Sequence, residues 1–223
     1  TLNADATQNG LSILGSLNGC MTLMDLSSGA AAVQWGNFDN MNGLTIRNIH
    51  LKGWGGALSI NNCSNVLIED CVFENSNNVA AEVIALSTSQ NVIFRRCSFL
   101  GNINPAGRAV RIDNSGTSGN RILFDDCNFG CNSSNAEGAA MLIGAGSFVQ
   151  INGGVFSGNQ TTASGKGGAI FVAVGADLIA QGSKFIQNVA SSSISTEGGG
   201  AIYVDGNSNT TSTTVLLDAC HFY

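Results

Sequence analysis

The residues of this chain that come closest to a catalytic arrangement are two adjacent carboxylates, Asp125 and Asp126. Two carboxyl groups about 5–9.5 Å apart can cleave a glycosidic bond by general acid and base catalysis when their pKa values are separated. Arg96 would add a basic group of the kind that a lyase uses to abstract a proton. These three residues form the candidate catalytic cluster of a polysaccharide-active enzyme, either a lyase or a glycoside hydrolase.

Other chemistries receive little support from the composition. The net charge of −6 and the pI near 4.6 argue against a nucleic-acid partner, which needs clustered Lys and Arg. The seven cysteines include no CxxC pair and only two histidines accompany them, so we expect no metal and no cofactor. No apolar run reaches the roughly 18 residues of a membrane-spanning helix, so no membrane span is expected within this segment.

The elements that must position these residues are short and repeated. One phrase usually ends in phenylalanine: LTIRNIHL (44–51), VLIEDCVF (66–73), VIFRRCSF (92–99), ILFDDCNF (122–129), VQINGGVF (149–156), LIAQGSKF (178–185) and VLLDACHF (215–222). A second phrase alternates with it: GGALSI (55–60), AEVIAL (81–86), GRAVRI (107–112), GAAMLI (138–143), GGAIFV (167–172) and GGAIYV (199–204). Apolar residues alternate within each phrase, which predicts strands with one buried face.

The cysteines indicate how these strands are arranged. Cys71, Cys97, Cys127 and Cys220 occupy the same position, two residues before the repeated phenylalanine. A parallel coil stacks equivalent positions about 4.8 Å apart, so like residues form interior ladders. We therefore predict an all-β fold, a right-handed parallel β-helix (solenoid) of about seven coils. Reduced, buried cysteines suit such a ladder, whereas Cys20, Cys63 and Cys131 lie outside it and leave disulfides open.

The expected domain is a single β-helix over residues 1–223. The clear repeats cover 44–222, and residues 1–43 would form a degenerate coil or cap. The last repeat strand stops at Tyr223 without a covering coil. An uncovered coil invites edge-to-edge association, so we expect a longer parent chain or another protein to stack there.

The repeat frame gives the candidate catalytic cluster a second interpretation. Acids and bases alternate at two equivalent positions of successive coils. These rows are Glu69–Arg95–Asp125 and Asp70–Arg96–Asp126. Such rows are typical of ion pairs on a surface, whose effect on stability is modest.

Outward positions of the strands predict two binding surfaces. The first row is apolar, with Thr45 and Gln150 as polar exceptions: Leu67, Ile93, Leu123, Ile179 and Leu216. The second row consists of Leu142, Phe171 and Tyr203. Exposed apolar patches usually mark contacts, and the alternative for the first row is that long loops of the chain cover it.

Four Asn-x-Ser/Thr sequons permit a secreted protein. The candidate glycosylation sites are Asn62, Asn132, Asn159 and Asn209.

The repeats also resemble those of a known family. FSGN (156–159), FIQN (185–188) and GGAI (167–170 and 199–202) are similar to the repeats of chlamydial polymorphic outer membrane proteins. The resemblance covers roughly residues 44–222, with degenerate copies at 81–86 and 107–112. That family is made of surface proteins of the autotransporter type within the pectate-lyase-like β-helix class. The resemblance implies an elongated extracellular or cell-surface protein.

The sequence therefore favours a non-catalytic structural or adhesive module. Such a module would bind a protein or glycan at a surface, or take part in a larger assembly, through its stacked strand faces. The alternative is a polysaccharide-active enzyme that uses Asp125, Asp126 and Arg96.

Overall fold

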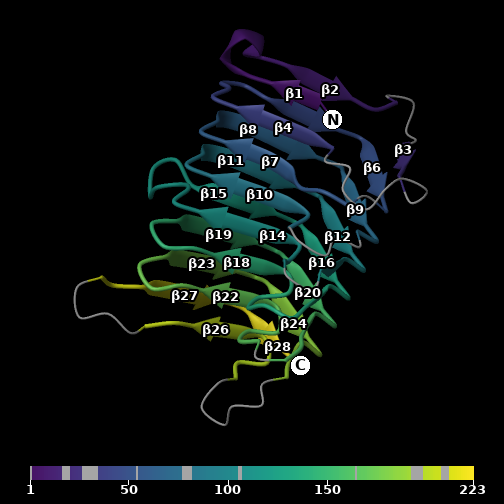
Figure 1. Ribbon diagram of the computed structural model, residues 1–223. Helices are drawn as coiled ribbons and strands as arrows, with labels where there is room; N and C mark the ends of the chain where they lie inside the picture. Colours follow the sequence, from purple (N-terminus) through teal and green to yellow (C-terminus); the bar gives the residue numbers. More distant parts are fainter. Residues whose placement is uncertain are drawn as a thin grey trace.

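A computed structural model shows the chain as a parallel β-solenoid in which every coil lies directly on the previous one (Figure 1). It describes residues 2–16, 21–26, 35–53, 55–76, 82–104, 107–163, 165–191, 198–206 and 211–223. Three main sheets, A, B and C, contain eight strands each, and a fourth sheet, D, contains four. The number of stacked strands is close to the predicted seven coils, and the all-β parallel solenoid is confirmed.

Sheets A, B and C each take one strand from every coil. Sheet A contains β1 (Leu2–Ala4), β4 (Gly36–Asp39), β7 (Leu58–Asn61), β10 (Ile84–Ser87), β14 (Val110–Asp113), β18 (Met141–Ile143), β22 (Ile170–Val172) and β26 (Ile202–Val204). Sheet B contains β2 (Ser12–Leu14), β5 (Thr45–Arg47), β8 (Ser64–Glu69), β11 (Gln90–Arg95), β15 (Ile122–Asp125), β19 (Phe148–Asn152), β23 (Asp177–Gln181) and β27 (Thr214–Asp218).

The third face and the corner that follows it complete the coil. Sheet C contains β3 (Thr22–Asp25), β6 (Ile49–Lys52), β9 (Val72–Glu74), β12 (Ser98–Leu100), β16 (Asn128–Gly130), β20 (Val155–Ser157), β24 (Lys184–Ile186) and β28 (His221–Phe222). Sheet D contains β13 (Ile103–Asn104), β17 (Ser133–Ser134), β21 (Gln160–Thr161) and β25 (Val189–Ala190). A single turn of 3₁₀ helix, η1 (Ala6–Gln8), follows β1. Within the described ranges, no helix is long and apolar enough to cross a membrane.

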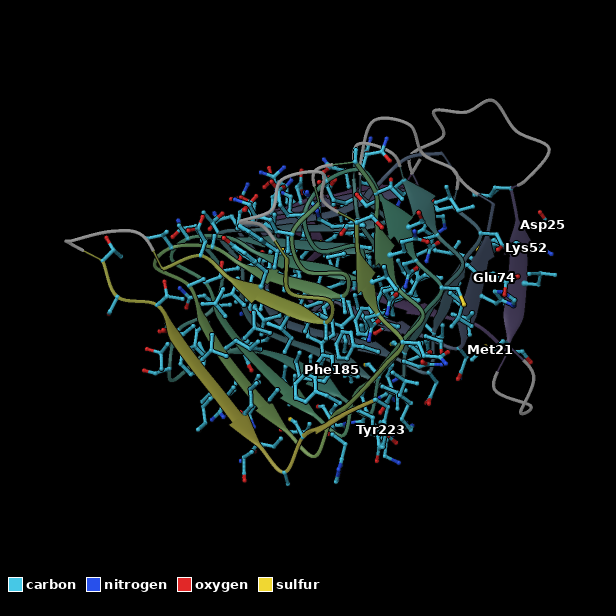
Figure 2. All side chains as sticks on the ribbon, turned by 90° about the horizontal axis from the view of Figure 1, so that it is seen from below. Met21, Asp25, Lys52, Glu74, Phe185 and Tyr223 are labelled. Atoms are coloured by element: carbon cyan, nitrogen blue, oxygen red, sulfur yellow. The ribbon has the colours of Figure 1, made fainter. Side chains whose placement is uncertain are left out.

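The interior is filled by residues that repeat from coil to coil. The repeated phenylalanines stack in one column, with Phe129 4.7 Å from both Phe99 and Phe156 between ring centroids. Phe185 points into the middle of the triangular cross-section (Figure 2). Each of these sheet C strands pairs in register with the equivalent strand of the next coil. Phenylalanines at equivalent positions therefore contact each other, and the column continues.

Polar interior ladders satisfy the backbone at the corners. Asn132 donates through Nδ2 to the carbonyl oxygen of Phe99 at 3.0 Å and to Oδ1 of Asn159 at 2.8 Å. The equivalent asparagines of the other coils repeat this pattern: Asn102, Asn159 and Asn188. The amide ladder therefore pairs buried carbonyl groups that would otherwise lose their hydrogen bonds at the turn.

The glycines of the GGA phrase form the corner between sheets D and A. Gly167 has a φ of +66°, and a Cβ atom there would lie 2.1 Å from the carbonyl oxygen of Ile170. A Cβ atom on Gly168 would lie 2.2 Å from the carbonyl oxygen of Gly200. Only glycine fits these two positions, so the phrase recurs for a steric reason.

Candidate functional site

The predicted charge rows form a network at the corner between sheets B and C. Glu69 is only 7% exposed, and its carboxylate contacts three guanidinium groups. These contacts are Arg47 Nε to Oε2 at 2.8 Å, Arg95 Nη1 to Oε1 at 3.3 Å and Arg96 Nη2 to Oε1 at 2.9 Å. Arg95 continues the row through an Nε contact of 3.2 Å to Asp125 Oδ2. Because the sign of the charge alternates along the row, Arg95 lies between two carboxylates, those of Glu69 and Asp125.

This network engages two members of the candidate catalytic cluster. Arg96 donates from Nε and Nη2 to the two carboxylate oxygens of Asp70 at 2.7 and 2.8 Å. The hydrogen bond with Asp70 raises the pKa of Arg96 above its ordinary value, so Arg96 holds its proton more firmly. The same bond lowers the pKa of Asp70. Asp126 is exposed at a turn with a φ of 54°. The ion pairs favour a structural role for Arg96 and Asp125 over proton transfer.

A second charge network lies beside sheet A and was not predicted. Arg108 is 6% exposed and donates from Nη1 to Glu82 Oε1 at 3.0 Å. Burial lowers the pKa of Arg108. Arg111 lies beside this pair, with Nη1 3.6 Å from Glu82 Oε1 and with Nε bonded to Asp113.

The sequence does carry a signal for this second network. Glu82 and Arg108 each stand two residues before the first residue of a sheet A strand, β10 and β14, so they occupy equivalent positions of neighbouring coils. The signal is easily missed because the AEVI and GRAV phrases depart from the GGA pattern of the other copies.

The apolar row predicted on sheet B is in register. Leu67 pairs with Ile93, and Ile93 pairs with Leu123. The remaining members of this column follow in the same order: Gln150, Ile179 and Leu216, with Thr45 on the N-terminal side. Leu67, Ile93 and Leu123 are half-buried, and Leu216 is 52% exposed. We call this column the apolar row.

The view along the solenoid decides whether loops cover the apolar row. In the part of the chain that the structure describes, no other segment lies outside sheet B, which carries only its own side chains there (Figure 2). Among the described residues, the apolar row is therefore open on its outer side.

Two further columns flank the apolar row on the same face. The first includes the amide row, which is the exposed pair Asn65 and Asn91, and in later coils Phe148, Asp177 and Thr214, which pair in register. The second, the charged row, consists of Arg47, Glu69, Arg95, Asp125, Asn152, Gln181 and Asp218. In the amide row, Asn91 donates from Nδ2 to Oδ1 of Asn65 at 2.6 Å.

The outward row on sheet A is less open than predicted. Leu142, Phe171 and Tyr203 do pair in register, as expected. However, Phe171 is only 8% exposed, because its ring is stacked on that of Tyr203 at 5.7 Å and 3°. Lys166 Nζ lies 5.2 Å from the centroid of the Tyr203 ring. Rings stacked along the solenoid axis do not present their faces to solvent, so Phe171 is not an accessible contact residue.

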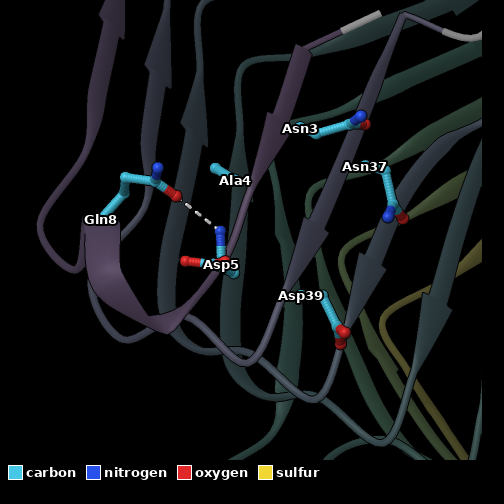
Figure 3. Close-up of a pocket in the computed structure, with 6 residues that line it drawn as sticks. All are labelled: Asn3, Ala4, Asp5, Gln8, Asn37 and Asp39. Atoms are coloured by element: carbon cyan, nitrogen blue, oxygen red, sulfur yellow. Dashed lines mark hydrogen bonds between the residues drawn. The ribbon is translucent and has the colours of Figure 1, made fainter.

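A shallow hollow of about 300 Å³ lies at the N-terminal end of sheet A (Figure 3). Its lining residues are Asn3, Ala4, Asp5, Gln8, Asn37 and Asp39. Asp5 caps η1 by accepting a hydrogen bond from the Thr7 backbone at 2.9 Å, and Gln8 Oε1 accepts one from the Asp5 backbone at 2.7 Å. The hollow thus offers amide and carboxylate groups, but the carboxylate of Asp5 is already engaged in capping η1.

Two of the candidate glycosylation sites are wrong for the folded protein. Asn132 and Asn159 are fully buried, and their Nδ2 atoms belong to the interior amide ladder. A glycan on either nitrogen would break that ladder. Asn62 is exposed and stays a candidate, whereas Asn209 lies outside the described residues.

The cysteines follow the predicted ladder. Cys71, Cys97 and Cys127 are buried free thiols, and Cys220 is half-buried. Cys63, which the sequence left open, is also a buried free thiol, and it continues a second interior ladder in which its backbone N–H donates to Ser89 Oγ at 3.1 Å. Cys131 is free and exposed, and Cys20 lies outside the described residues.

Comparison with known proteins agrees with this architecture. The model of a family described as "right handed beta helix region" matches residues 31–216, so the chain belongs to that family. The chain is also similar to the crystal structure of a pectate lyase from a Bacillus species in complex with trigalacturonate. The TM-score is 0.45 and the sequence identity 11%, over 94% of this chain and 84% of that chain. No curated protein sequence matches the chain.

Proposed function

We propose that this chain is a non-catalytic structural or adhesive module, extracellular or at a cell surface, that binds through the outer face of sheet B. The observation that carries the proposal is the apolar row, in which Leu67, Ile93 and Leu123 stack in register on an open face. An open apolar stripe between polar rows has the composition of a contact surface. The resemblance to repeats of surface proteins points in the same direction.

The arrangement of charges supports binding rather than catalysis. A general acid and base must exchange protons during the reaction. Arg96 and Asp125 are instead held in ion pairs with Asp70 and Arg95. Their contacts join neighbouring coils, which is a structural use of the same charges.

One experiment separates the two functions. The purified chain is incubated with a panel of neutral and acidic polysaccharides and with intact cell surfaces, with and without calcium. The measurements are the retention of the chain on these surfaces and the cleavage of the polysaccharides. We expect retention without cleavage, and we expect Ile93→Glu to abolish retention. A matched control, Val155→Glu, makes the same change at a half-buried outward position of sheet C.

Cleavage of any polysaccharide that disappears in Asp126→Ala would overturn the non-catalytic proposal. It would assign Asp125, Asp126 and Arg96 to a lyase or hydrolase. Retention that is equally reduced by Val155→Glu and Ile93→Glu would also contradict a specific role of sheet B.

A further inference from the structure

We infer that the interior column of Cys71, Cys97 and Cys127 is an oxidation site, at which Cys97 forms a disulfide bond with one of its two neighbours. We call these three residues the thiol column. The inference goes beyond the proposed function, which uses the outer face of sheet B and none of these thiols. All three side chains are at most 1% exposed and are free thiols in the structure.

The strands on both sides of the cysteines place the thiol column on three consecutive coils. Before the cysteines, β11 pairs in register with β8 and with β15, and after them β12 pairs with β9 and with β16. Equivalent positions of adjacent parallel strands lie about 4.8 Å apart. The Cα atoms of a disulfide lie about 4.4–6.8 Å apart, so residues on adjacent coils are within this range.

The same spacing decides which pairs can form. Cys97 has a cysteine on the coil before it and another on the coil after it. Cys71 and Cys127 are two coils apart, a separation of about 9.6 Å that is too long for a disulfide. Any disulfide within the thiol column therefore includes Cys97.

The sulfur atoms are directed along the column. Sγ of Cys97 lies 3.4 Å from the carbonyl oxygen of Ile68, which belongs to the preceding coil. Sγ of Cys127 lies 3.5 Å from the carbonyl oxygen of Phe94, again on the preceding coil. Each sulfur atom is thus turned toward the coil that carries the previous cysteine, where its partner lies.

No other described cysteine has a cysteine neighbour of this kind. Cys220 occupies an equivalent position, but Ser183 stands on the coil before it. Cys63 belongs to another interior ladder, in which its neighbour is Ser89. Cys131 is exposed at a different corner. The structure therefore assigns one disulfide and names its possible members.

The oxidant in this reaction is a small disulfide such as oxidised glutathione. A cysteine thiolate attacks one sulfur atom of the oxidant, forms a mixed disulfide and releases one thiol molecule. A neighbouring thiolate of the column then attacks the cysteine sulfur of the mixed disulfide and displaces the second thiol molecule. The column loses two electrons and two protons, the oxidant is reduced to two thiols, and the third cysteine keeps its thiol.

Burial makes this oxidation slow in the folded chain. It raises the pKa of Cys97 well above the ordinary value, so little of the reactive thiolate is present at neutral pH. Oxidation therefore takes place while the chain folds or when neighbouring coils separate locally. The extracellular location in the proposed function would supply oxidising conditions, but the geometry of the thiol column does not depend on that location.

The test uses the full chain with Cys20→Ser and Cys131→Ser, because Cys131 is exposed and Cys20 lies outside the described residues. This chain is refolded and equilibrated in mixtures of reduced and oxidised glutathione. Remaining thiols are alkylated, and disulfide-linked peptides are identified by mass spectrometry. We expect one disulfide in each chain, either Cys71–Cys97 or Cys97–Cys127.

Serine variants decide which neighbours react. Serine is a matched replacement, because Ser183 is already buried at the equivalent position of a later coil. Cys71→Ser should leave only the Cys97–Cys127 disulfide, and Cys127→Ser only Cys71–Cys97. Cys97→Ser should lower the disulfide-bonded fraction at least about tenfold, because the two remaining thiols are two coils apart. Circular dichroism confirms that every variant is folded.

The same chain kept unfolded in urea is the control. There the short loop between Cys63 and Cys71 favours a disulfide between these two residues. In the folded chain the six-residue strand β8 separates them by about 20 Å.

Three outcomes would overturn the inference. The first is a thiol column that stays reduced, or carries only glutathione adducts, in every mixture. The second is a Cys71–Cys127 disulfide in folded Cys97→Ser, and the third is a Cys63–Cys71 disulfide in the folded chain. Loss of the proposed binding by sheet B would leave all of these results unchanged, so the two failures are distinguishable.

Discussion

Asparagine forms a ladder both inside and outside this solenoid, and the two ladders have different surroundings. Inside, Asn132 is fully buried. Its side-chain amide is hydrogen-bonded to the asparagines of the two neighbouring coils, Asn102 and Asn159, and to the carbonyl oxygen of Phe99. Outside, Asn91 is exposed, has a φ of 50° and bonds to Asn65 through its side chain. The interior ladder supplies hydrogen bonds to buried groups that water does not reach. Water can supply the hydrogen bonds of the exterior ladder, because that ladder is exposed.

The same contrast applies to the apolar columns. The interior phenylalanines touch like residues above and below and other core residues around them. The apolar row of sheet B touches like residues above and below but has an open side. Stacking of equivalent residues therefore produces stability in the interior and a repeating contact surface outside, and four predictions test this difference.

The largest effect is expected from the interior column. Phe129→Ala should lower the free energy of unfolding by about 3–5 kcal/mol, because it leaves a cavity between two stacked rings. Leu123→Ala, one strand earlier on the outer face, should cost less than about 1.5 kcal/mol. Urea denaturation followed by circular dichroism measures both. Equal losses would show that the two columns do not differ as the structure indicates.

The asparagine ladders should differ nearly as much. Asn132→Leu keeps the volume but leaves the carbonyl of Phe99 and the backbone N–H of Asn102 without their partner, so a loss of about 2–4 kcal/mol is expected. Asn91→Gly is the control, since glycine accepts the positive φ and only an exposed hydrogen bond is lost, at a cost of about 1 kcal/mol or less. The same denaturation measurement applies. A larger loss for Asn91→Gly would reverse the assignment of the two ladders.

The charge network should show a smaller difference of the same kind. Glu69→Gln removes the negative charge that holds three guanidinium groups together, and we expect a loss of about 1–3 kcal/mol. Asp125→Asn, at a more exposed end of the row, should cost less than about 1 kcal/mol. Thermal unfolding at low and high salt distinguishes them. The difference should shrink at high salt, and a difference that grows would contradict an electrostatic origin.

The smallest effect is the pH dependence at Asp70. Its pKa is lowered by Arg96 from an ordinary value of 3.8, so the carboxylate stabilises the fold above that pH. This contribution is lost as the pH falls through the lowered pKa. In Asp70→Asn the melting temperature should therefore decline less between about pH 4 and pH 2 than in the unchanged chain. Identical acid profiles would show that the bond to Arg96 contributes nothing to stability.

Much of the fold could be predicted because a solenoid converts sequence equivalence into spatial contact. The phenylalanine and cysteine positions repeat in the sequence and stack in space, and Glu69, Arg95 and Asp125 alternate in both. The predicted glycosylation of Asn132 and Asn159 is wrong for a reason that the local sequence does not contain. Both sequons are locally normal, yet the burial of the two asparagines depends on the neighbouring coils.

By itself, the sequence determined the strand period, the interior columns, the alternation of charge and the outward position of Leu67 and its equivalents. Periodicity of two fixes which side of a strand a residue occupies, and the repeat fixes its neighbours. Only the tertiary structure decided which outward residues stay accessible. Phe171 is covered by stacking on Tyr203, whereas the row through Ile93 is open because no described segment of the chain passes outside sheet B. Accessibility depends on where distant parts of the chain run, and no local pattern encodes it.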